Sequence, residues 1–291
     1  MKTVIIITGP TASGKTAASI QLAKKLSTSI ISADSRQCYK ELNIGVARPS
    51  LEELQVIPHY FIASHSIKEE VTAAGFEDYA LNKAADLFKE HDEVVMVGGT
   101  GLYIKAFCEG LDQVPEVPAT VREEIINSYK EKGLNWLQEK IKIKDPAFYA
   151  EGEIQNPQRM MRALEVVQST GQSILSFRKG KKTERPFVIK KIGIEISKED
   201  LHRNIDKRVD QMIENGLVEE AINSLPFRHL NALQTVGYTE LFDHFDGKIS
   251  LDQAIAEIKT HTRQYAKRQL TWFKKDEGIK WMKPDSIPLF P

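Results

Sequence analysis

Residues 4–16 read Val-Ile-Ile-Ile-Thr-Gly-Pro-Thr-Ala-Ser-Gly-Lys-Thr, a short β-branched run followed by a glycine-rich turn. The turn fits the spacing GxxxxGK[ST], in which backbone N–H groups wrap a phosphate at the positive end of the following helix. Ile20, Ala23 and Leu26 share one side of residues 17–26 and indicate that helix. We therefore expect a strand, a phosphate-binding turn and a helix; the alternative is a glycine turn beside a surface lysine.

The backbone N–H groups of this turn can wrap a diphosphate. Lys15 adds positive charge, and the Thr16 hydroxyl can hold Mg²⁺, the cofactor that the motif implies. The set, called the phosphate cradle below, is Gly9, Pro10, Thr11, Ala12, Ser13, Gly14, Lys15 and Thr16.

Two further apolar runs indicate a sheet around the first strand. Residues 29–32 and 94–97 lack the alternation of a half-exposed strand, as expected of strands that are covered on both faces of a parallel sheet. Helical patterning over residues 76–90 lies between them and indicates βαβ units. The expected fold class is α/β, with a P-loop NTPase-like parallel sheet flanked by helices.

The character of the chain changes after the third strand. Pro115 and Pro118 interrupt it, and the sequence that follows has helix signals but no strand. We expect an inserted all-helical subdomain over residues 113–187 and a core domain made of residues 1–112 and 188–291.

One helix of the insert is well marked. Asn156-Pro157 predicts its start, with Asn as N-cap and Pro at the first helical position, and Gly171 predicts its end. Its expected interior residues are Met161, Leu164 and Val167, and the residues expected to share another face are Arg159 and Arg162.

The core domain is expected to resume with a strand at residues 192–196. Ser197-x-x-Asp200 then predicts a helix start, and Ser250-x-x-Gln253 predicts the start of a last long helix. On that last helix the expected packed face carries Ile255, Ile258, Tyr265 and Trp272, and the expected basic face carries Arg263, Lys267 and Lys274.

Charge is balanced over the chain but not along it. The 291 residues contain 40 Lys and Arg and 40 Asp and Glu, so no overall field attracts the molecule to nucleic acid or an anionic membrane. Residues 158–208, however, hold 13 basic and 6 acidic residues. Such segregation favours a local groove for a polyanion, although the basic run at residues 178–182 could equally be a solvated loop.

Nothing in the sequence suggests export or a membrane span, so we expect a cytoplasmic protein without membrane partners. Cys38 and Cys108 have no CxxC spacing, and the seven histidines have no ligand spacing. Neither a zinc site nor a disulfide framework is therefore expected.

The acidic residues are unusual for a P-loop protein. A γ-phosphoryl-transferring P-loop enzyme usually has an acid at the end of a neighbouring strand, yet residues 94–97 are followed by Gly98-Gly99-Thr100-Gly101. Asp34 instead follows a strand at the edge where ligands bind in doubly wound sheets. A carboxylate near a diphosphate requires a role, either for a metal or as a proton acceptor, and the alternative is an N-cap residue.

Spacing alone does not decide the roles of two more residues. Thr100 could place its hydroxyl against the diphosphate or be a turn residue, and Arg122 could be a solvated charge.

Five segments combine into a resemblance to the bacterial tRNA dimethylallyltransferase family, running from residue 4 to about 273. They are the phosphate cradle GPTASGKT, ISADSRQCY at 31–39, GGTGLY at 98–103, NPQRMMRALE at 156–165 and KRQLTWF at 267–273. The resemblance implies transfer of a dimethylallyl group from dimethylallyl diphosphate to N6 of the adenine 3′ of the anticodon. The cradle would then hold a leaving diphosphate, and no γ-phosphoryl machinery would be needed.

The resemblance also implies roles for single residues. Asp34 would take the proton of N6, while Lys15, Thr100, Arg208 and Mg²⁺ at Thr16 would offset the charge of the departing diphosphate. The residues implied in tRNA contact are Asp34, Ser35, Arg36, Gln37, Thr100, Arg122, Gln158, Arg159, Met160, Met161 and Arg162. A single chain would contain the whole site, so a monomer is expected.

The chain departs from the family pattern at Val46, Arg48, Tyr60 and Asn204, which puts local diphosphate or tRNA contacts in doubt. An adenylate prenyltransferase is the alternative nearest in chemistry, but it would need neither a basic insert nor a long basic helix. A P-loop small-molecule kinase and a non-catalytic RNA-binding module are the alternatives from other classes.

Overall fold

The computed structural model describes residues 1–180 and 182–289 and divides into two compact units. The core unit comprises residues 1–109 and 184–291, and the helical unit comprises residues 110–183. These limits lie a few residues before the expected limits at 112 and 187. Lys181, in the basic run at residues 178–182, lies outside the described residues.

The core unit is built on a six-stranded parallel sheet of order β3-β2-β4-β1-β5-β6. The central strand β1 leads into the phosphate cradle, and its last residue, Thr8, pairs with Gly98 of β4 and Gly193 of β5. Because all strands run in the same direction, their carboxyl ends meet at one edge of the sheet. The strands are β1 (Thr3–Thr8), β2 (Ile30–Ser32), β3 (His59–Tyr60), β4 (Glu93–Gly98), β5 (Val188–Ile194) and β6 (Ile279–Met282).

Both faces of the sheet are covered, as the continuous apolar runs predict. Val4 and Ile6 of β1 pack into one core cluster, and Ile5 and Ile7 pack into the other. Each of these side chains is at most 1% exposed, which corresponds to roughly 1.5–3 kcal/mol of hydrophobic stabilisation apiece. The parallel sheet with helices on both faces is thereby confirmed.

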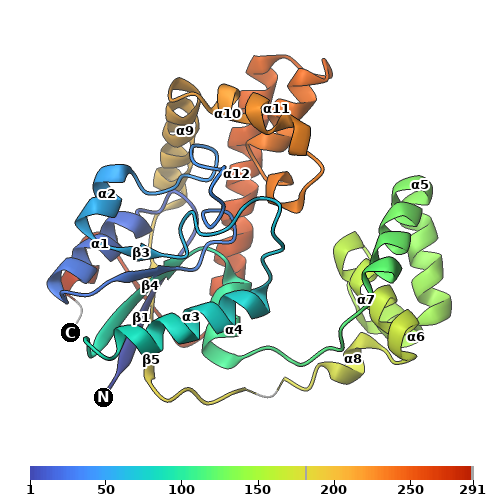
Figure 1. Cartoon of the computed structure of the whole chain (residues 1–291). Coiled ribbons are helices and arrows are strands. Elements are labelled where there is room, and N and C mark those ends of the chain that lie inside the picture. Colours follow the sequence, from blue (N-terminus) through green and yellow to red (C-terminus); the bar gives the residue numbers. More distant parts are fainter. Residues whose placement is uncertain (181, 290–291) are drawn as a thin grey trace. The chain divides into compact units, whose positions relative to one another are not determined.

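Helices surround these strands (Figure 1). α1 packs on the Ile5 face through Ala18 and Leu22, while α3, α4, α9 and α12 contribute to the other cluster. The helices of the core unit are α1 (Lys15–Lys25), α2 (Leu51–Val56), α3 (Ala73–Leu87), α4 (Gly101–Glu109), α9 (Lys198–Glu214), α10 (Leu217–Ser224), α11 (Tyr238–Phe245) and α12 (Leu251–Phe273), with 3₁₀ turns η1 (Leu225–Phe227), η2 (Asn231–Leu233) and η3 (Pro284–Leu289).

The described part of the helical unit contains helices and no strand, as expected. Its helices are α5 (Ala119–Lys144), α6 (Pro146–Glu151), α7 (Pro157–Thr170) and α8 (Ile174–Phe177). The Asn156 side chain caps α7 by accepting a hydrogen bond from Arg159 N, and Gly171 ends the helix with a φ of 72°. Both boundary predictions for this helix are confirmed.

Two other predicted boundaries need correction. The strand expected at residues 192–196 is β5, which begins at Val188 and ends at Ile194. Its Lys190-Lys191 pair hid the early start, because lysines are unusual in a covered strand; Lys191 reaches Asp276 with an N–O distance of 2.6 Å. The short elements α2, β3 and β6 were missed, although the capping box at Ser50 and Glu53 was a readable signal for α2.

The expected faces of α12 are also partly wrong. Tyr265 is 37% exposed and Trp272 is 41% exposed, so neither is a core residue. The residues that α12 buries are Ala254, Ile258, Ala266, Gln269 and Phe273. Among the described residues, no helix combines the length and the apolar character that crossing a membrane requires.

Candidate active site

The phosphate cradle has the backbone shape that its sequence predicts. Gly9 has a φ of 151°, Ala12 one of 62° and Gly14 one of 88°, so the chain turns sharply between β1 and the first turn of α1. Gly14 precedes α1 directly and leaves the backbone N–H groups of the first helical turn open to a ligand.

Polar side chains from the cradle itself and from α9 hold it in place. The Lys15 amine donates to the Pro10 carbonyl at 2.6 Å. The Arg208 guanidinium of α9 donates to the Thr11 hydroxyl at 3.1 Å, and the Asn204 amide donates to the Ala12 carbonyl at 3.1 Å. Asn204, a departure from the family pattern, therefore supports the cradle by a neutral contact.

The charge of Lys15 is unusually easy to remove. Burial, together with the neighbouring positive charge of Arg208, lowers the pKa of Lys15 to about 7, and the negative charge of Asp34 opposes the shift. Burial also lowers the pKa of Arg208. Both cations are thus held in a site that lacks the negative charge needed to balance them, as expected of a site built for an anion.

The packing at the end of β4 explains why no acidic side chain stands there. A Cβ at Gly98 would lie 2.1 Å from the Ala33 carbonyl oxygen, so no side chain fits there. The neighbouring strands approach closely because Ala33 N donates to the Val97 carbonyl at 2.7 Å. The carboxylate at this edge of the sheet is therefore that of Asp34, which follows β2, and not that of a residue after β4.

Asp34 and Thr100 form one hydrogen-bonded turn. The Asp34 Oδ1 atom accepts from Arg36 N at 2.9 Å and from Gln37 N at 3.2 Å. The Thr100 Oγ1 atom accepts from Ser35 N at 3.0 Å. The Thr100 hydroxyl is thus directed at the Asp34 turn, which it stabilises.

A cavity of about 340 Å³ brings the predicted groups together. It is lined by Thr11 to Thr16 of the cradle and by Asp34, Arg36, Gln37 and Arg208. Gly9, Pro10, Ser35 and Thr100, also predicted, are not among its lining residues. Lining residues that sequence reasoning missed include Glu53, Met212, Thr235, Tyr265 and Gln269.

One wall of the cavity is the loop that contains Gly45, Val46 and Ala47. The Gln37 amide donates to the carbonyls of Val46 and Ala47 at 3.2 and 2.8 Å. Glu220 accepts from the backbone N atoms of residues 43, 44 and 45, and its Oε1 also accepts from the Tyr238 hydroxyl at 2.6 Å. The loop is therefore fixed by side chains on both sides.

Two family departures in this region have structural roles. Arg48 donates to the carbonyls of Tyr39, Lys40 and Leu42, so it holds its own loop. The Lys83 amine lies 4.5 Å from the centre of the Tyr60 ring, a cation–π contact on β3.

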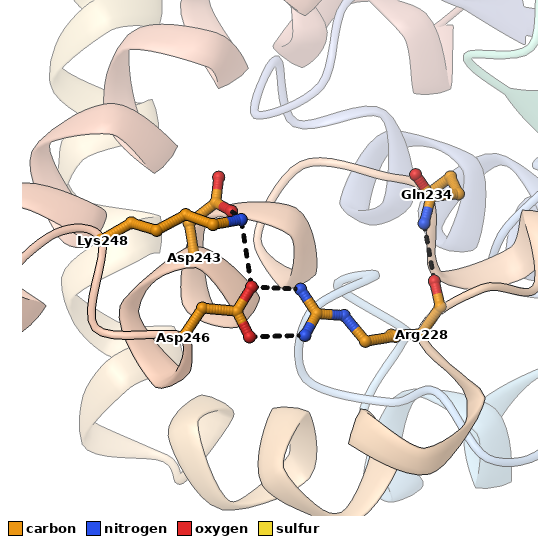
Figure 2. Close-up of polar contacts among 5 residues, drawn as sticks. All are labelled: Arg228, Gln234, Asp243, Asp246 and Lys248. Carbon is orange, nitrogen blue, oxygen red and sulfur yellow. Dashed lines mark hydrogen bonds and ion pairs between the residues drawn. The ribbon is translucent and has the colours of Figure 1, made fainter. Parts of the chain in front are cut away.

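Another wall of the cavity is formed by Thr235, Val236 and Gly237. The residue before it, Gln234, contacts an ion-pair network (Figure 2). Arg228 makes two parallel hydrogen bonds to Asp246, and Lys248 contacts both Asp246 and Asp243. The Gln234 amide donates to the Arg228 carbonyl at 2.6 Å. Because Gln234 directly precedes Thr235, the network ties this wall to the turn after α11.

The helical unit carries the other predicted residues, and they differ in burial. Gln158 and Arg159 are exposed, whereas Arg162 lies 3.1 Å from the buried carboxylate of Glu165, which also contacts Arg122 at 3.6 Å. Met160 and Met161 are buried in the core of the unit. The expectation of direct tRNA contact through these two side chains does not fit their burial, because both are packing residues.

The residues at the cradle fit a magnesium ion that arrives with its ligand. Among the described residues, no group of three or more His, Cys, Asp or Glu side chains could hold a metal by itself. Thr16 lines the cavity, and Mg²⁺ commonly combines few protein ligands with phosphate oxygens and water. Thr16 is the residue that would hold the ion beside a diphosphate.

Comparison with known proteins decides the family. A family model described as IPP transferase matches residues 37–276. The chain belongs to the IPP transferase family. A tRNA dimethylallyltransferase from Christiangramia forsetii is 49% identical over 282 residues, covering 97% of this chain and 93% of the relative. One from Cytophaga hutchinsonii is 45% identical over 286 residues, covering 98% of this chain and 94% of the relative.

Solved structures of IPP transferases have the same fold. The tRNA isopentenylpyrophosphate transferase of Bacillus halodurans aligns with a TM-score of 0.71 at 33% identity, over 98% of this chain and 90% of that one. A eukaryotic dimethylallyltransferase acting on tRNA aligns with a TM-score of 0.80 at 26% identity, over 98% and 74%. As an IPP transferase, the chain is a prenyltransferase that modifies tRNA.

Proposed function

We propose that this IPP transferase moves a dimethylallyl group from dimethylallyl diphosphate to N6 of the adenine at position 37 of tRNA, directly 3′ of the anticodon. The observation that carries the proposal is the single cavity that contains both a cationic phosphate cradle and a carboxylate. The first suits a leaving diphosphate and the second suits an amine that must lose a proton.

The reaction exchanges one bond for another. The N6 nitrogen attacks the allylic carbon, the bond from that carbon to the diphosphate oxygen breaks, and Asp34 takes the N6 proton. Lys15 and Arg208 stabilise the negative charge that develops on the leaving diphosphate. Mg²⁺ held at Thr16 would supply further positive charge there.

The contacts of Asp34 and Thr100 support the proposed role of the Asp34 carboxylate. The Asp34 Oδ1 atom accepts from two backbone N–H groups, which hold the carboxylate in place at the cavity. Thr100 keeps Ser35, and with it this turn, in place.

The RNA is proposed to bind through basic residues outside the cradle. Ser35 and Arg36 line a second hollow of the core unit together with His261 and Arg268. In the helical unit, Gln158 and Arg159 are exposed and available to an RNA backbone, with Arg162 and Arg122 near Glu165 as further candidates. A monomer in the cytoplasm, where tRNA is found, is the proposed working form.

The deciding experiment incubates the purified chain and Mg²⁺ with labelled dimethylallyl diphosphate and either an anticodon stem-loop RNA or AMP. We expect label on the RNA and, after digestion, a nucleoside whose mass equals adenosine plus one dimethylallyl group. Label on AMP alone would indicate an adenylate prenyltransferase. Phosphoryl transfer from ATP without prenyl transfer would indicate a kinase.

A further inference from the structure

Gln269 of α12 is a buried polar residue, 7% exposed, to which the scheme above gives no task. Its carboxamide makes two hydrogen bonds to two separate turns of the site. The oxygen Oε1 accepts from Thr11 N at 2.8 Å, and the nitrogen Nε2 donates to the Gly99 carbonyl at 2.9 Å. One side chain therefore joins the phosphate cradle to the turn after β4.

The geometry around Gly99 is built for this contact. A Cβ at residue 99 would lie 2.3 Å from the Gln269 Nε2 atom. A glycine is needed there, because any side chain would push the carboxamide away from both partners.

The connection continues from Gly99 to Asp34. The next residue, Thr100, donates its N–H to the Ala33 carbonyl at 3.2 Å, and its hydroxyl accepts from Ser35 N at 3.0 Å. Ala33 and Ser35 flank Asp34 on either side. Gln269 thus lies between the group that holds the leaving diphosphate and the residues that hold the carboxylate.

We propose that Gln269 is a positioning residue that fixes the spacing between the phosphate cradle and Asp34. The inference rests on the proposed function, in which the amine, the allylic carbon and the leaving oxygen must be aligned. Displacement reactions are sensitive to such alignment, since a misplacement of about 1 Å can cost about a hundredfold in rate. Gln269 itself exchanges no proton and touches no reacting atom in this role.

Two substitutions of Gln269 test what its two hydrogen bonds contribute. Gln269→Met keeps the length of the side chain and removes both hydrogen bonds. Gln269→Glu keeps an acceptor for Thr11 N but turns a carboxylate oxygen toward the Gly99 carbonyl. With RNA and prenyl donor saturating, we expect single-turnover transfer to be slower in both variants by about tenfold or more, and RNA affinity to be unchanged.

The pH profile of the Gln269→Glu variant adds a readout that a purely structural role would not move. Burial next to a carbonyl oxygen raises the pKa of the introduced carboxyl group, and its protonated form can donate to Gly99 as the carboxamide does. The transfer rate of this variant, divided by the wild-type rate at the same pH, is therefore expected to rise as the pH falls. The same ratio for Gln269→Met is expected to stay flat.

Gln211 provides a matched control, since it is an exposed glutamine on α9. Gln211→Met and Gln211→Glu are expected to transfer at the wild-type rate. Wild-type rates in both Gln269 variants would overturn the inference, as would a parallel loss of thermal stability and RNA affinity that accounts for the slower transfer. If the wild-type chain itself transfers no label, the proposed function fails instead.

Discussion

At the scale of single residues, the proposed chemistry depends on Lys15 and Asp34, which line one cavity. Lys15 has a pKa lowered to about 7, and Asp34 is hydrogen-bonded by two backbone N–H groups. Substitution and pH therefore test these two side chains separately.

Replacing Asp34 by Asn tests the proposed proton acceptor. The Asn oxygen can accept from Arg36 N and Gln37 N as the carboxylate does, so the turn is expected to persist. Because an amide is a very weak base, we expect prenyl transfer to fall by about 10²–10⁴-fold in a single-turnover assay. Affinity for RNA, measured in parallel, should change little; an unchanged transfer rate would assign the proton to another group.

Diphosphate binding is expected to take up protons at Lys15. A lowered pKa means that at about pH 8 the amine of the free chain is mostly neutral, and the charge of a bound diphosphate raises that pKa again. Uptake is therefore expected at about pH 8 and should vanish at about pH 6, where the amine is already charged.

The measurement is calorimetric titration with inorganic diphosphate in two buffers of different ionisation enthalpy. The Lys15→Met variant is the control and should lack this part of the proton uptake. Equal uptake by the variant and the wild type would contradict the assignment.

Sequence reasoning found Lys15 and Asp34 through their motifs, and the family resemblance pointed to Arg208. Lys15, Asp34 and Arg208 lie in one cavity as predicted, and the first two follow strands that meet at one edge. Gln269, Tyr265 and Glu53 were missed because their place depends on how α2 and α12 dock on the sheet, which local spacing does not encode. Gly99 was the available signal, since a glycine pair after a buried strand indicates a close approach by another group.

At the scale of the elements, helix boundaries were easier to predict than helix faces. The caps of α7, α9 and α12 all lie at the predicted Asn156, Ser197 and Ser250. The packed face of α12 was partly misjudged, because Ile258 is buried as expected whereas Tyr265 and Trp272 are both more than a third exposed. Ala254 and Ala266 are among the residues that α12 buries, and their small side chains let the helix approach its neighbours closely.

Arg159 of α7 tests the RNA surface of the helical unit. Its exposed ion pair with Glu153 contributes little stability, so Arg159→Gln is expected to leave the melting temperature unchanged. We expect weaker RNA binding and a salt dependence reduced by about one phosphate contact, with diphosphate binding unaffected. Arg162 is the poorer choice for substitution, because removing it leaves the buried Glu165 short of a partner. Equal losses for RNA and diphosphate would indicate misfolding.

At the scale of the whole molecule, a neutral chain has to bind a polyanion. The 40 basic and 40 acidic residues give no net attraction, so RNA affinity must come from local basic residues such as those between 158 and 208. The two-unit organisation and the sheet were predictable from patterns, whereas the limits of the units shifted by a few residues because linker positions carry no packing signal.

Salt should therefore separate the two substrates. Raising the ionic strength is expected to weaken anticodon stem-loop binding steeply, with a linear dependence on a double-logarithmic plot, because several backbone phosphates release counterions. Binding of inorganic diphosphate should weaken much less, since it involves one compact ligand in a cavity. Parallel slopes for both ligands would argue against a multi-phosphate RNA surface.

The order of the strands has a consequence for biosynthesis. β1 is translated before the other strands of the sheet, yet it lies in the middle of that sheet, and its neighbour β5 begins only at Val188. All of residues 110–183 are translated before that neighbour exists. Until β5 is translated, the strongly apolar strand β1 lacks one of its two neighbours in the sheet, and such long-range pairing is slow and exposed to aggregation.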